Sequence, residues 1–282
     1  MDVEARLRAD RMSKRMEWIE TLILEVTRRC NFRCAHCLRG EAEDAVMSDA
    51  VIRAAFRGVK YIGTIIPSGG EPGLVPHVIQ RIIDIAKEED TEIGNFYIAT
   101  NGSIASDEYM RAIMNLWLFC TDNESSQVEI SETDYHQFCG QDEEAIKKLE
   151  MLRFVSHRKK LESQYVIAEG RGEFLCEANG TIDGARRVKA RAWEVDEDDD
   201  EGRLRDMPYV NVYGTVISEC DFSYARQEEN KDGNILIDSW QEIIARNQRR
   251  VVTYTATEHP IQTFPKAEWL AGTEPTLGGQ PA

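Results

Sequence analysis

Short apolar runs of strand type alternate with longer segments of helical periodicity along most of this sequence. The predicted strands are residues 22–26, 62–67, 95–100, 125–131 and 163–170, with 209–214 as a sixth. The predicted helices are residues 48–60, for which Ser48 is the expected N-cap, 75–90, 106–119 and 142–158.

This alternation predicts a parallel sheet covered by helices, because a helix that joins two parallel strands makes a right-handed crossover. About six strand–helix units are too few for a closed eight-stranded barrel. The predicted fold is therefore α/β, an open, partial (β/α)6 barrel of the TIM type with a short C-terminal extension.

The expected domains follow from composition along the chain. They are an N-terminal helix over residues 1–20, the barrel core over 21–208, a C-terminal segment over 209–270 and a disordered tail over 271–282. The first 20 residues are densely charged and lack the apolar segment of a secretory signal. None of the apolar stretches reaches the length of about 20 residues that a membrane helix needs. We therefore expect a cytoplasmic protein without a membrane segment.

The formal net charge of the chain is −16 at pH 7. Binding to a nucleic-acid backbone requires a basic surface. The charge therefore argues against DNA or RNA as a partner.

The cysteines are gathered at one point and isolated elsewhere. The stretch "CNFRCAHC" holds Cys30, Cys34 and Cys37 within eight residues, at positions 30–37, directly after an apolar run. The other four appear singly in the sequence: Cys120, Cys139, Cys176 and Cys220. An odd number of cysteines without an export signal argues against a disulfide framework and favours a reducing compartment. We expect one metal site and four bystander thiols.

The number of ligands in this stretch limits the kind of metal site. A structural zinc ion is held by four protein ligands, and His36, between two of the cysteines, is the one local candidate for the fourth. Bringing its side chain back between its neighbours would strain so short a loop. An iron–sulfur cubane is compatible with three thiolates, which leave the fourth iron open to another ligand. A non-catalytic zinc- or cluster-binding protein remains the alternative.

Three further motifs follow the next predicted strands in order. They are "SGGEP" at 68–72, "TNG" at 100–102 and "EISETD" at 129–134. The three cysteines have the spacing Cys-x3-Cys-x2-Cys, and His36 occupies the aromatic position just before the third. With this spacing and the three motifs, the chain resembles the radical S-adenosylmethionine superfamily from residue 20 to about residue 170.

The resemblance implies an enzyme with two cofactors, a 4Fe–4S cluster and S-adenosylmethionine. Cys30, Cys34 and Cys37 would be the catalytic cysteines that hold the cluster. Reductive cleavage of S-adenosylmethionine would give a 5′-deoxyadenosyl radical, which abstracts hydrogen from the substrate. The electron would come from a low-potential donor of the flavodoxin or ferredoxin type.

The resemblance also implies a set of cofactor-binding residues. Gly69 and Gly70 allow the backbone to approach a ligand closely, and Glu71 offers an acceptor for the methionyl ammonium. A polar group after the fourth strand would meet the ribose and the carboxylate, but "SETD" has Ser-x-x-Asp where the family has Ser-x-Asp. The implied set is His36, Gly69, Gly70, Glu71, Asn101, Ser131, Thr133 and Asp134. Whether Thr133 or Asp134 contacts ribose stays open.

Two residues near this set have open roles. Asn101 is either a contact of the cofactor or a turn residue before glycine. His136 is expected to be a hydrogen-bonded structural group rather than a catalyst.

Residues 209–247 resemble the start of the C-terminal SPASM or twitch extension, which in relatives binds auxiliary clusters. Cys220 has no cysteine after it, so we expect no auxiliary cluster and instead a segment that caps the barrel or shapes the substrate cavity. We expect Cys220 to be a packing residue, with a role as hydrogen donor or substrate ligand as the alternative. The resemblance favours a peptide substrate, and a small molecule such as a nucleotide or sugar derivative is the alternative.

Overall fold

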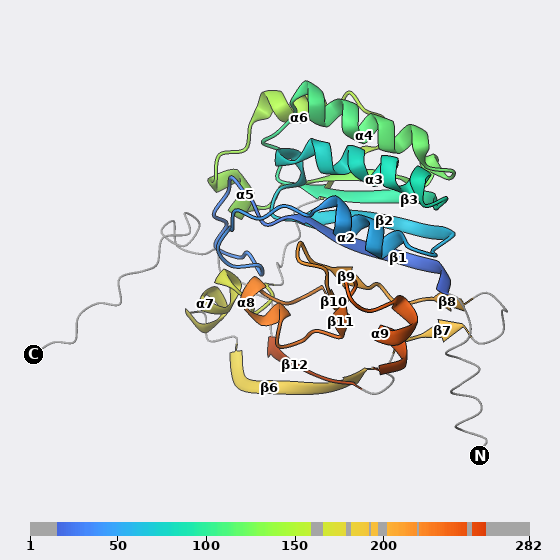
Figure 1. Cartoon of the computed structure of the whole chain (residues 1–282). Coiled ribbons are helices and arrows are strands. Elements are labelled where there is room, and N and C mark those ends of the chain that lie inside the picture. Colours follow the sequence, from blue (N-terminus) through green and yellow to red (C-terminus); the bar gives the residue numbers. More distant parts are fainter. Residues whose placement is uncertain are drawn as a thin grey trace, which may run out of the picture.

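The structure is a computed structural model that describes residues 16–158, 166–178, 182–191, 193–196, 202–218, 220–246 and 250–257 (Figure 1). Residues 1–15 of the expected N-terminal helix and the expected tail at 271–282 lie outside the described residues.

Five parallel strands follow one another in chain order. They are β1 (Met16–Thr27), β2 (Tyr61–Gly69), β3 (Glu92–Thr100), β4 (Gln127–Ser131) and β5 (Val155–Arg158). The main path of the sheet is β11-β10-β9-β1-β2-β3-β4-β5, with β8 and β7 off this path, and the sheet does not close within the described residues. The prediction of an α/β fold with an open, partial barrel is confirmed.

The helices of this half are α2 (Asp49–Phe56), α3 (Pro76–Glu88), α4 (Asp107–Phe119), α5 (Asp134–Phe138) and α6 (Glu143–Leu149), with 3-10 turns at Pro72–Leu74 and Asn123–Ser125. Ser106 begins α4 by accepting a hydrogen bond from the Tyr109 amide at 3.2 Å. Ser48 is the N-cap of α2, as predicted, but its side chain makes no capping hydrogen bond.

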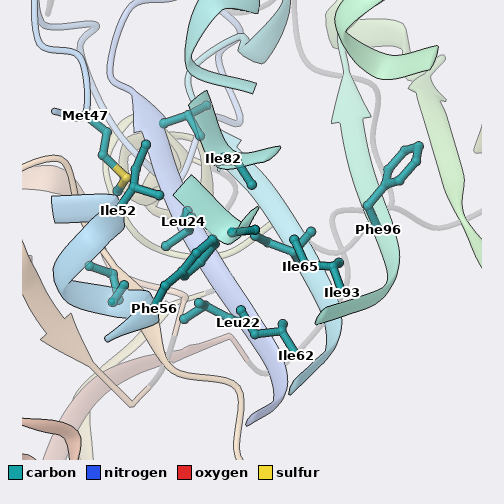
Figure 2. Packing of buried hydrophobic residues seen from close by; sticks show 14 of the residues in the cluster. Leu22, Leu24, Met47, Ile52, Phe56, Ile62, Ile65, Ile82, Ile93 and Phe96 are labelled. Atoms are coloured by element: carbon teal, nitrogen blue, oxygen red, sulfur yellow. The ribbon is translucent and has the colours of Figure 1, made fainter. Parts of the chain in front are cut away.

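The main core lies between the strands and these helices (Figure 2). Leu22 and Leu24 of β1 and Ile62 and Ile65 of β2 are fully buried against Phe56 of α2 and its neighbours. Successive side chains of a strand point to opposite faces, so Ile23, between Leu22 and Leu24, faces the other way. Burial of these large aliphatic side chains, at about 25 cal/mol per Å² of apolar area, stabilises the barrel and fixes the register of its strands.

The C-terminal elements extend the sheet beyond β1. They are β8 (Gly202–Leu204), which pairs with β7 (Val195–Asp196), β9 (Tyr209–Val210), β10 (Thr215–Ile217), α8 (Tyr224–Gln227), β11 (Gly233–Asn234) and α9 (Trp240–Arg246). Strand β9 runs parallel to β1, so the sixth predicted strand lies beside the first one. A separate antiparallel pair joins β6 (Ile182–Arg191) to β12 (Arg250–Thr257), and α7 (Arg171–Ala178) precedes it.

The C-terminal segment also covers part of the face of the sheet opposite the helices. Ile23, which alternates with Leu22 and Leu24, packs against Tyr209, Ile217 and Phe222 in a separate cluster. Cys220 is half-buried at the edge of this cluster, which agrees with its interpretation as a packing residue.

Three of the predicted elements are wrong. Residues 16–20, expected in a helix, form the start of β1. The helix predicted at 142–158 ends at Leu149. The last four residues of the predicted range form strand β5, which pairs with β4 through Val155 and Val128. The strand predicted at 163–170 does not form within its described residues 166–170. The basic residues after Val155 have the composition of a helix surface, but here pairing with β4 satisfies the backbone.

Candidate functional site

The three clustered cysteines lie on the loop that follows the carboxyl end of β1. We call residues 28–45 the cluster loop. Its base is closed by backbone hydrogen bonds from the Arg28 amide to the Ala45 carbonyl at 2.9 Å and from the Glu43 amide to the Arg28 carbonyl at 3.1 Å. Inside it, the Cys37 amide donates to the Cys34 carbonyl at 3.1 Å. These bonds keep all three thiols on one short, turned segment.

The thiols are sheltered from solvent. Only 6% of Cys34 is exposed, and burial raises its pKa; burial also raises the pKa of Cys30 to about 11. Both thiols are therefore protonated at neutral pH when no metal is bound. Metal binding to such groups displaces the protons.

Five of the chain's seven cysteines meet in one apolar cluster. Beside the three of the cluster loop, it contains Cys139, at the end of α5, and Cys176, in α7. Cys139 and Cys176, which stand singly in the sequence, therefore lie beside the loop cysteines in the fold. Cys139 donates a hydrogen bond to Cys34, and the two sulfur atoms are 3.8 Å apart. The residues are 105 positions apart in the sequence, so no local pattern predicts the contact.

The ring of His36 lies at the centre of an aromatic group. It stacks on Tyr135 with the ring centroids 4.4 Å apart, and it meets the edge of His136 at 5.0 Å. Burial lowers the pKa of His36 to about 3, with a further contribution from His136. Its Nδ1 atom is buried and has no hydrogen-bond partner within the described part of the chain. A buried nitrogen of this kind is suited to a ligand that supplies the missing hydrogen bond.

The glycines after β2 are required by the close approach of two backbones. The Gly70 amide donates to the Thr27 carbonyl at 2.8 Å. A Cβ atom at Gly69 would lie 2.0 Å from the Thr27 carbonyl oxygen, and one at Gly70 would lie 2.1 Å from that of Arg29. The structure thus joins this turn directly to the start of the cluster loop.

Glu71 is buried, and both of its carboxylate oxygens accept hydrogen bonds. Oε1 accepts from the Gly73 amide at 3.0 Å and from Thr100 Oγ1 at 2.9 Å, and Oε2 accepts from the Asn101 amide at 2.8 Å. Burial raises the pKa of Glu71, and these hydrogen bonds oppose the rise. The carboxylate therefore ties the end of β2 to the end of β3.

Asn101 connects the end of β3 to the cluster loop. Its Nδ2 donates to Asn31 Oδ1 at 3.0 Å, and Asn31 in turn donates to Ser103 Oγ at 2.7 Å. Gln141 joins the next strand end, because its Nε2 donates to the carbonyls of Asn101 and Ser131 at 2.7 and 2.9 Å. The predicted motifs after β1, β2, β3 and β4 are thus brought together at one end of the sheet.

The polar group after β4 lies at the start of α5. Ser131 is the last residue of the strand and is buried, Thr133 is the N-cap of α5, and Asp134 is its first residue. The hydroxyl of Thr133 lies 2.7 Å from Nδ1 of His136, so that histidine is hydrogen-bonded as predicted.

The described residues contain no group of three or more His, Cys, Asp or Glu side chains placed to hold a single metal ion. Among the same residues, no helix is both long enough and apolar enough to span a membrane.

Comparison with known proteins identifies the half of the chain that carries these motifs. Residues 24–156 match the family model described as "Radical SAM superfamily". The chain carries a radical SAM domain. The match includes the cluster loop and the turns after β2, β3 and β4. No curated protein matches the chain.

Two solved structures with a TM-score of 0.50 support the fold. Native anSMEcpe with bound AdoMet and Cp18Cys peptide is 12% identical, with 80% of this chain and 79% of that chain covered and a TM-score of 0.50. The same protein with AdoMet and Kp18Cys peptide is 13% identical, with 81% of each chain covered and a TM-score of 0.50. Streptococcus suis SuiB bound to precursor peptide SuiA is 9% identical, with 86% and 67% covered and a TM-score of 0.39.

The cofactors of a radical SAM domain are a 4Fe–4S cluster and S-adenosylmethionine, and the chain is accordingly an enzyme. The residues of this chain fit such a pair. Three thiols on one loop pack in an apolar cluster, in which Cys34 is buried and Cys30 and Cys37 are partly buried, and the same loop carries the orphaned Nδ1 of His36. The radical SAM family needs an external reductant.

Two residues that clamp the cluster loop were not identified from the sequence. Arg171 donates from Nε to the Cys34 carbonyl at 2.9 Å and from its amide to the Cys37 carbonyl at 3.0 Å. A Cβ atom at Gly170 would lie 2.5 Å from the Gly40 amide nitrogen and 2.8 Å from the Cys37 carbonyl oxygen. The glycine before a helix was the one local signal for this contact.

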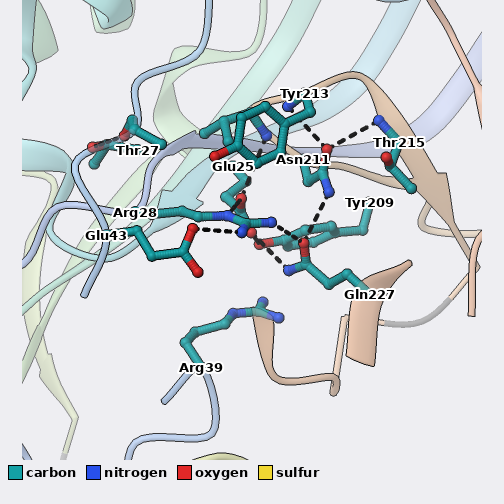
Figure 3. Close-up of polar contacts among 12 residues, drawn as sticks. Glu25, Thr27, Arg28, Arg39, Glu43, Tyr209, Asn211, Tyr213, Thr215 and Gln227 are labelled. Atoms are coloured by element: carbon teal, nitrogen blue, oxygen red, sulfur yellow. Dashed lines mark hydrogen bonds and ion pairs between the residues drawn. The ribbon is translucent and has the colours of Figure 1, made fainter. Parts of the chain in front are cut away.

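The base of the cluster loop is fixed by a buried polar network (Figure 3). Arg28 is 5% exposed and donates to Glu25 at 2.7 Å, to Glu43 at 2.8 Å and to Gln227 at 2.6 Å. Tyr209 donates its hydroxyl to Glu25 as well. The network therefore joins β1 and the cluster loop to the C-terminal segment.

Aromatic rings of the C-terminal segment complete this network. The Arg28 guanidinium lies 4.9 Å from the ring centroid of Tyr213 and 4.4 Å from that of Tyr224. Arg39, on the other side of the cluster loop, lies 4.5 Å from the centroid of Tyr209 and donates to the Phe222 carbonyl at 2.8 Å. The negative electrostatic potential of the ring faces stabilises both guanidinium cations through cation–π attraction.

The face of β3, β4 and β5 opposite the helices is polar. Tyr97 donates its hydroxyl to Glu129, and Arg158 contacts the same carboxylate at 3.1 Å. The Arg158 side chain is about half exposed. Burial raises the pKa of Tyr97 to about 12, and the Glu129 hydrogen bond adds to the rise. This face offers hydrogen-bonding groups beside the strand ends that carry the motifs.

Proposed function

We propose that Cys30, Cys34 and Cys37 hold the 4Fe–4S cluster and that the enzyme modifies a peptide. We further propose that it works in the cytoplasm, where a flavodoxin or ferredoxin type of protein supplies the electron. The observation that carries the cluster assignment is the group of three thiols on one loop at the carboxyl end of β1, sheltered in an apolar cluster.

The proposed S-adenosylmethionine site surrounds this loop. It comprises His36, Gly69, Gly70, Glu71, Asn101, Ser131, Thr133 and Asp134. Glu71 acts by fixing the turn after β2, because both its oxygens already accept hydrogen bonds from the protein. His36 supplies a flat, neutral ring for stacking, because its lowered pKa keeps it uncharged. Hydroxyl and carboxylate groups at Thr133 and Asp134 suit the ribose.

When bound, the cluster would supply the electron for cleavage of S-adenosylmethionine, and the two cofactors together would supply the radical that removes a hydrogen atom from the substrate. The chain's own part is to hold three thiolates on one loop, to orient the second cofactor and to keep water away. Water is kept away by the apolar cluster around the loop cysteines and by the C-terminal segment that packs beside β1.

Two features support a peptide as substrate. The structural neighbour anSMEcpe is described with a bound peptide. In this chain, the guanidinium of Arg158 is about half exposed on the face of the sheet opposite the helices, where it pairs with the largely buried carboxylate of Glu129. These groups suit the amides and charged side chains of a peptide.

Oxygen-free purification tests the cluster assignment. The native protein should be brown, contain about four irons per chain and release 5′-deoxyadenosine when it is reduced with S-adenosylmethionine. Cys34→Ala should lose both the colour and the product, whereas Cys120→Ala, which alters a buried thiol of the main core, should keep both. Turnover by Cys34→Ala, or a colourless native protein with one zinc, would refute the assignment.

Deuterium transfer tests the substrate class. An extract of the native host grown on deuterated medium is separated by size, and each fraction is incubated with the reduced enzyme. Label in 5′-deoxyadenosine from the peptide fraction, lost after protease digestion, supports the proposal. Label that comes from the small-molecule fraction and survives the protease contradicts it.

A further inference from the structure

Cys139 is a fourth thiol in contact with the cluster loop. It ends α5, and its amide donates to the His136 carbonyl at 3.1 Å, so its backbone is fixed by that helix. Its Sγ atom lies 3.8 Å from Sγ of Cys34. Two sulfur atoms at this separation are in van der Waals contact.

The two thiols differ in their exposure to solvent. Cys34 is buried, whereas Cys139 is half-buried and closer to solvent. Cys176, the fifth cysteine of the apolar cluster, is fully buried. Its thiol donates a hydrogen bond to the Val166 carbonyl at 3.5 Å. Cys139 is therefore accessible to a small oxidant in solvent, as the half-buried Cys30 and Cys37 are, and its sulfur contacts that of Cys34.

We propose that Cys34 and Cys139 form a reversible disulfide when the cluster is absent. A disulfide needs the two sulfur atoms about 2.05 Å apart, so the proposal requires the side chains of Cys34 and Cys139 to turn toward each other from their 3.8 Å separation. The consequence for assembly rests on the proposed function, because it requires Cys34 to be a cluster ligand. The disulfide itself does not depend on that assignment.

Hydrogen peroxide is a sufficient oxidant. The Cys139 thiolate attacks one peroxide oxygen, the O–O bond breaks, and a sulfenic acid and one water are formed. Cys34 then loses its proton as its sulfur attacks the sulfenic sulfur, the sulfenic oxygen takes up that proton and leaves as a second water, and the S–S bond forms. Two thiols lose two electrons and two protons in total, and one peroxide becomes two waters. A dithiol reverses the reaction by exchange.

The disulfide has two effects on a cluster-free chain. It withholds one of the three loop thiols from iron until a reductant acts. It also keeps Cys34 from the sulfinic and sulfonic acids, which thiols do not reverse. The pair would thus hold the oxidised chain in a state from which the cluster can be rebuilt.

Peptide mapping of the full-length, cluster-free protein tests the proposal. The protein is treated with one equivalent of hydrogen peroxide, its remaining thiols are alkylated, and the digest is analysed by mass spectrometry. We expect a peptide pair linked through Cys34 and Cys139. Iron uptake without a thiol reductant should fall about tenfold and recover after dithiothreitol reverses the exchange.

Variants separate this pair from other thiols. Cys139→Ser and Cys139→Ala should lack the cross-link, take up iron like the native chain when reduced, and lose the reversible block after peroxide. Cys120→Ser should behave like the native chain. A link from Cys34 to Cys30 or Cys37 in place of Cys139, or no link, would overturn the proposal. A link between Cys34 and Cys139 without any effect on iron uptake would support the disulfide and count against Cys34 as a cluster ligand.

Discussion

The base and the middle of the cluster loop are held in different ways. At the base, Arg28 has three hydrogen-bonded partners and two aromatic rings around it, and Glu25 is fully buried. In the middle, Cys34 and His36 are surrounded by thiols, rings and apolar groups, and the buried Nδ1 of His36 has no hydrogen-bond partner among the described residues. The comparison indicates that the protein itself holds the base of the cluster loop, whereas groups in the middle of the loop are available to bind ligands.

The largest effect should come from the base. Arg28→Ala leaves the fully buried Glu25 without its cation, and breaking a buried pair in this way costs about 3–5 kcal/mol. Urea unfolding under nitrogen measures the loss. The control Arg53→Ala removes ion pairs on the exposed surface and should cost at most about 1 kcal/mol. Equal losses for the two variants would remove the distinction between the base and an ordinary surface.

A smaller effect is expected where the clamp meets the middle of the loop. Gly170 has φ +55°, and Gly170→Ala forces a Cβ atom against the backbone of Cys37 and Gly40. We expect a loss of about 1–3 kcal/mol and a lower iron content after reconstitution. Gly58→Ala is the matched control, because Gly58 has φ +77° and open space around it. If both variants lose stability equally and keep their iron, the clamp does not shape the loop.

A pH-dependent effect is expected from the aromatic group. Burial lowers the pKa of His136 from 6.5 to about 4, and the groups that face it are Thr133, His36 and the cation of Arg158. Between these pH values the unfolded chain binds a proton that the folded chain does not. The stability from His136 is therefore complete above pH 6.5 and is lost as the pH falls toward 4.

Urea unfolding at several pH values checks this effect. His136→Gln should reduce the loss of stability on acidification by about 1.4 kcal/mol per pH unit. His77→Gln, at an exposed position of α3, should leave the slope unchanged. An unchanged slope in His136→Gln would show that this ring is not kept neutral by the fold.

The smallest effect is expected from the stacking surface itself. His36→Phe keeps an aromatic ring on Tyr135, whereas His36→Ala removes it. A stacked pair contributes about 0.5–1.5 kcal/mol, so S-adenosylmethionine should bind His36→Ala up to about tenfold more weakly. Equilibrium dialysis with the cluster-loaded variants measures this. Weaker binding to His36→Phe than to His36→Ala would show that stacking is not the role of this position.

The sequence predicted the parts of the fold that local patterns encode. The carboxyl ends of strands β1 to β4, the helices α2 to α4 and the motifs at the strand ends follow from alternation, periodicity and turn residues within a few positions. The edge strand β5 was missed, because four residues with a basic end carry little periodicity.

Contacts between distant residues were not predictable in this way. Gln227 meets Arg28 across 199 positions, and Cys139 meets Cys34 across 105. Neither residue stands in a motif, so only the arrangement of the strands brings them to the cluster loop. The three loop cysteines were found because their spacing is itself local.

Electron–nuclear double resonance tests the central claim most directly, namely that three thiolates of this chain leave one iron of the cluster for S-adenosylmethionine. The protein is purified without oxygen, reduced, and mixed with S-adenosylmethionine labelled with ¹⁵N at its amino group. The account predicts ¹⁵N coupling to the cluster signal in the native protein and in Cys139→Ser alike. A cluster that shows no coupling, or one whose four irons are all held by side chains, would contradict it.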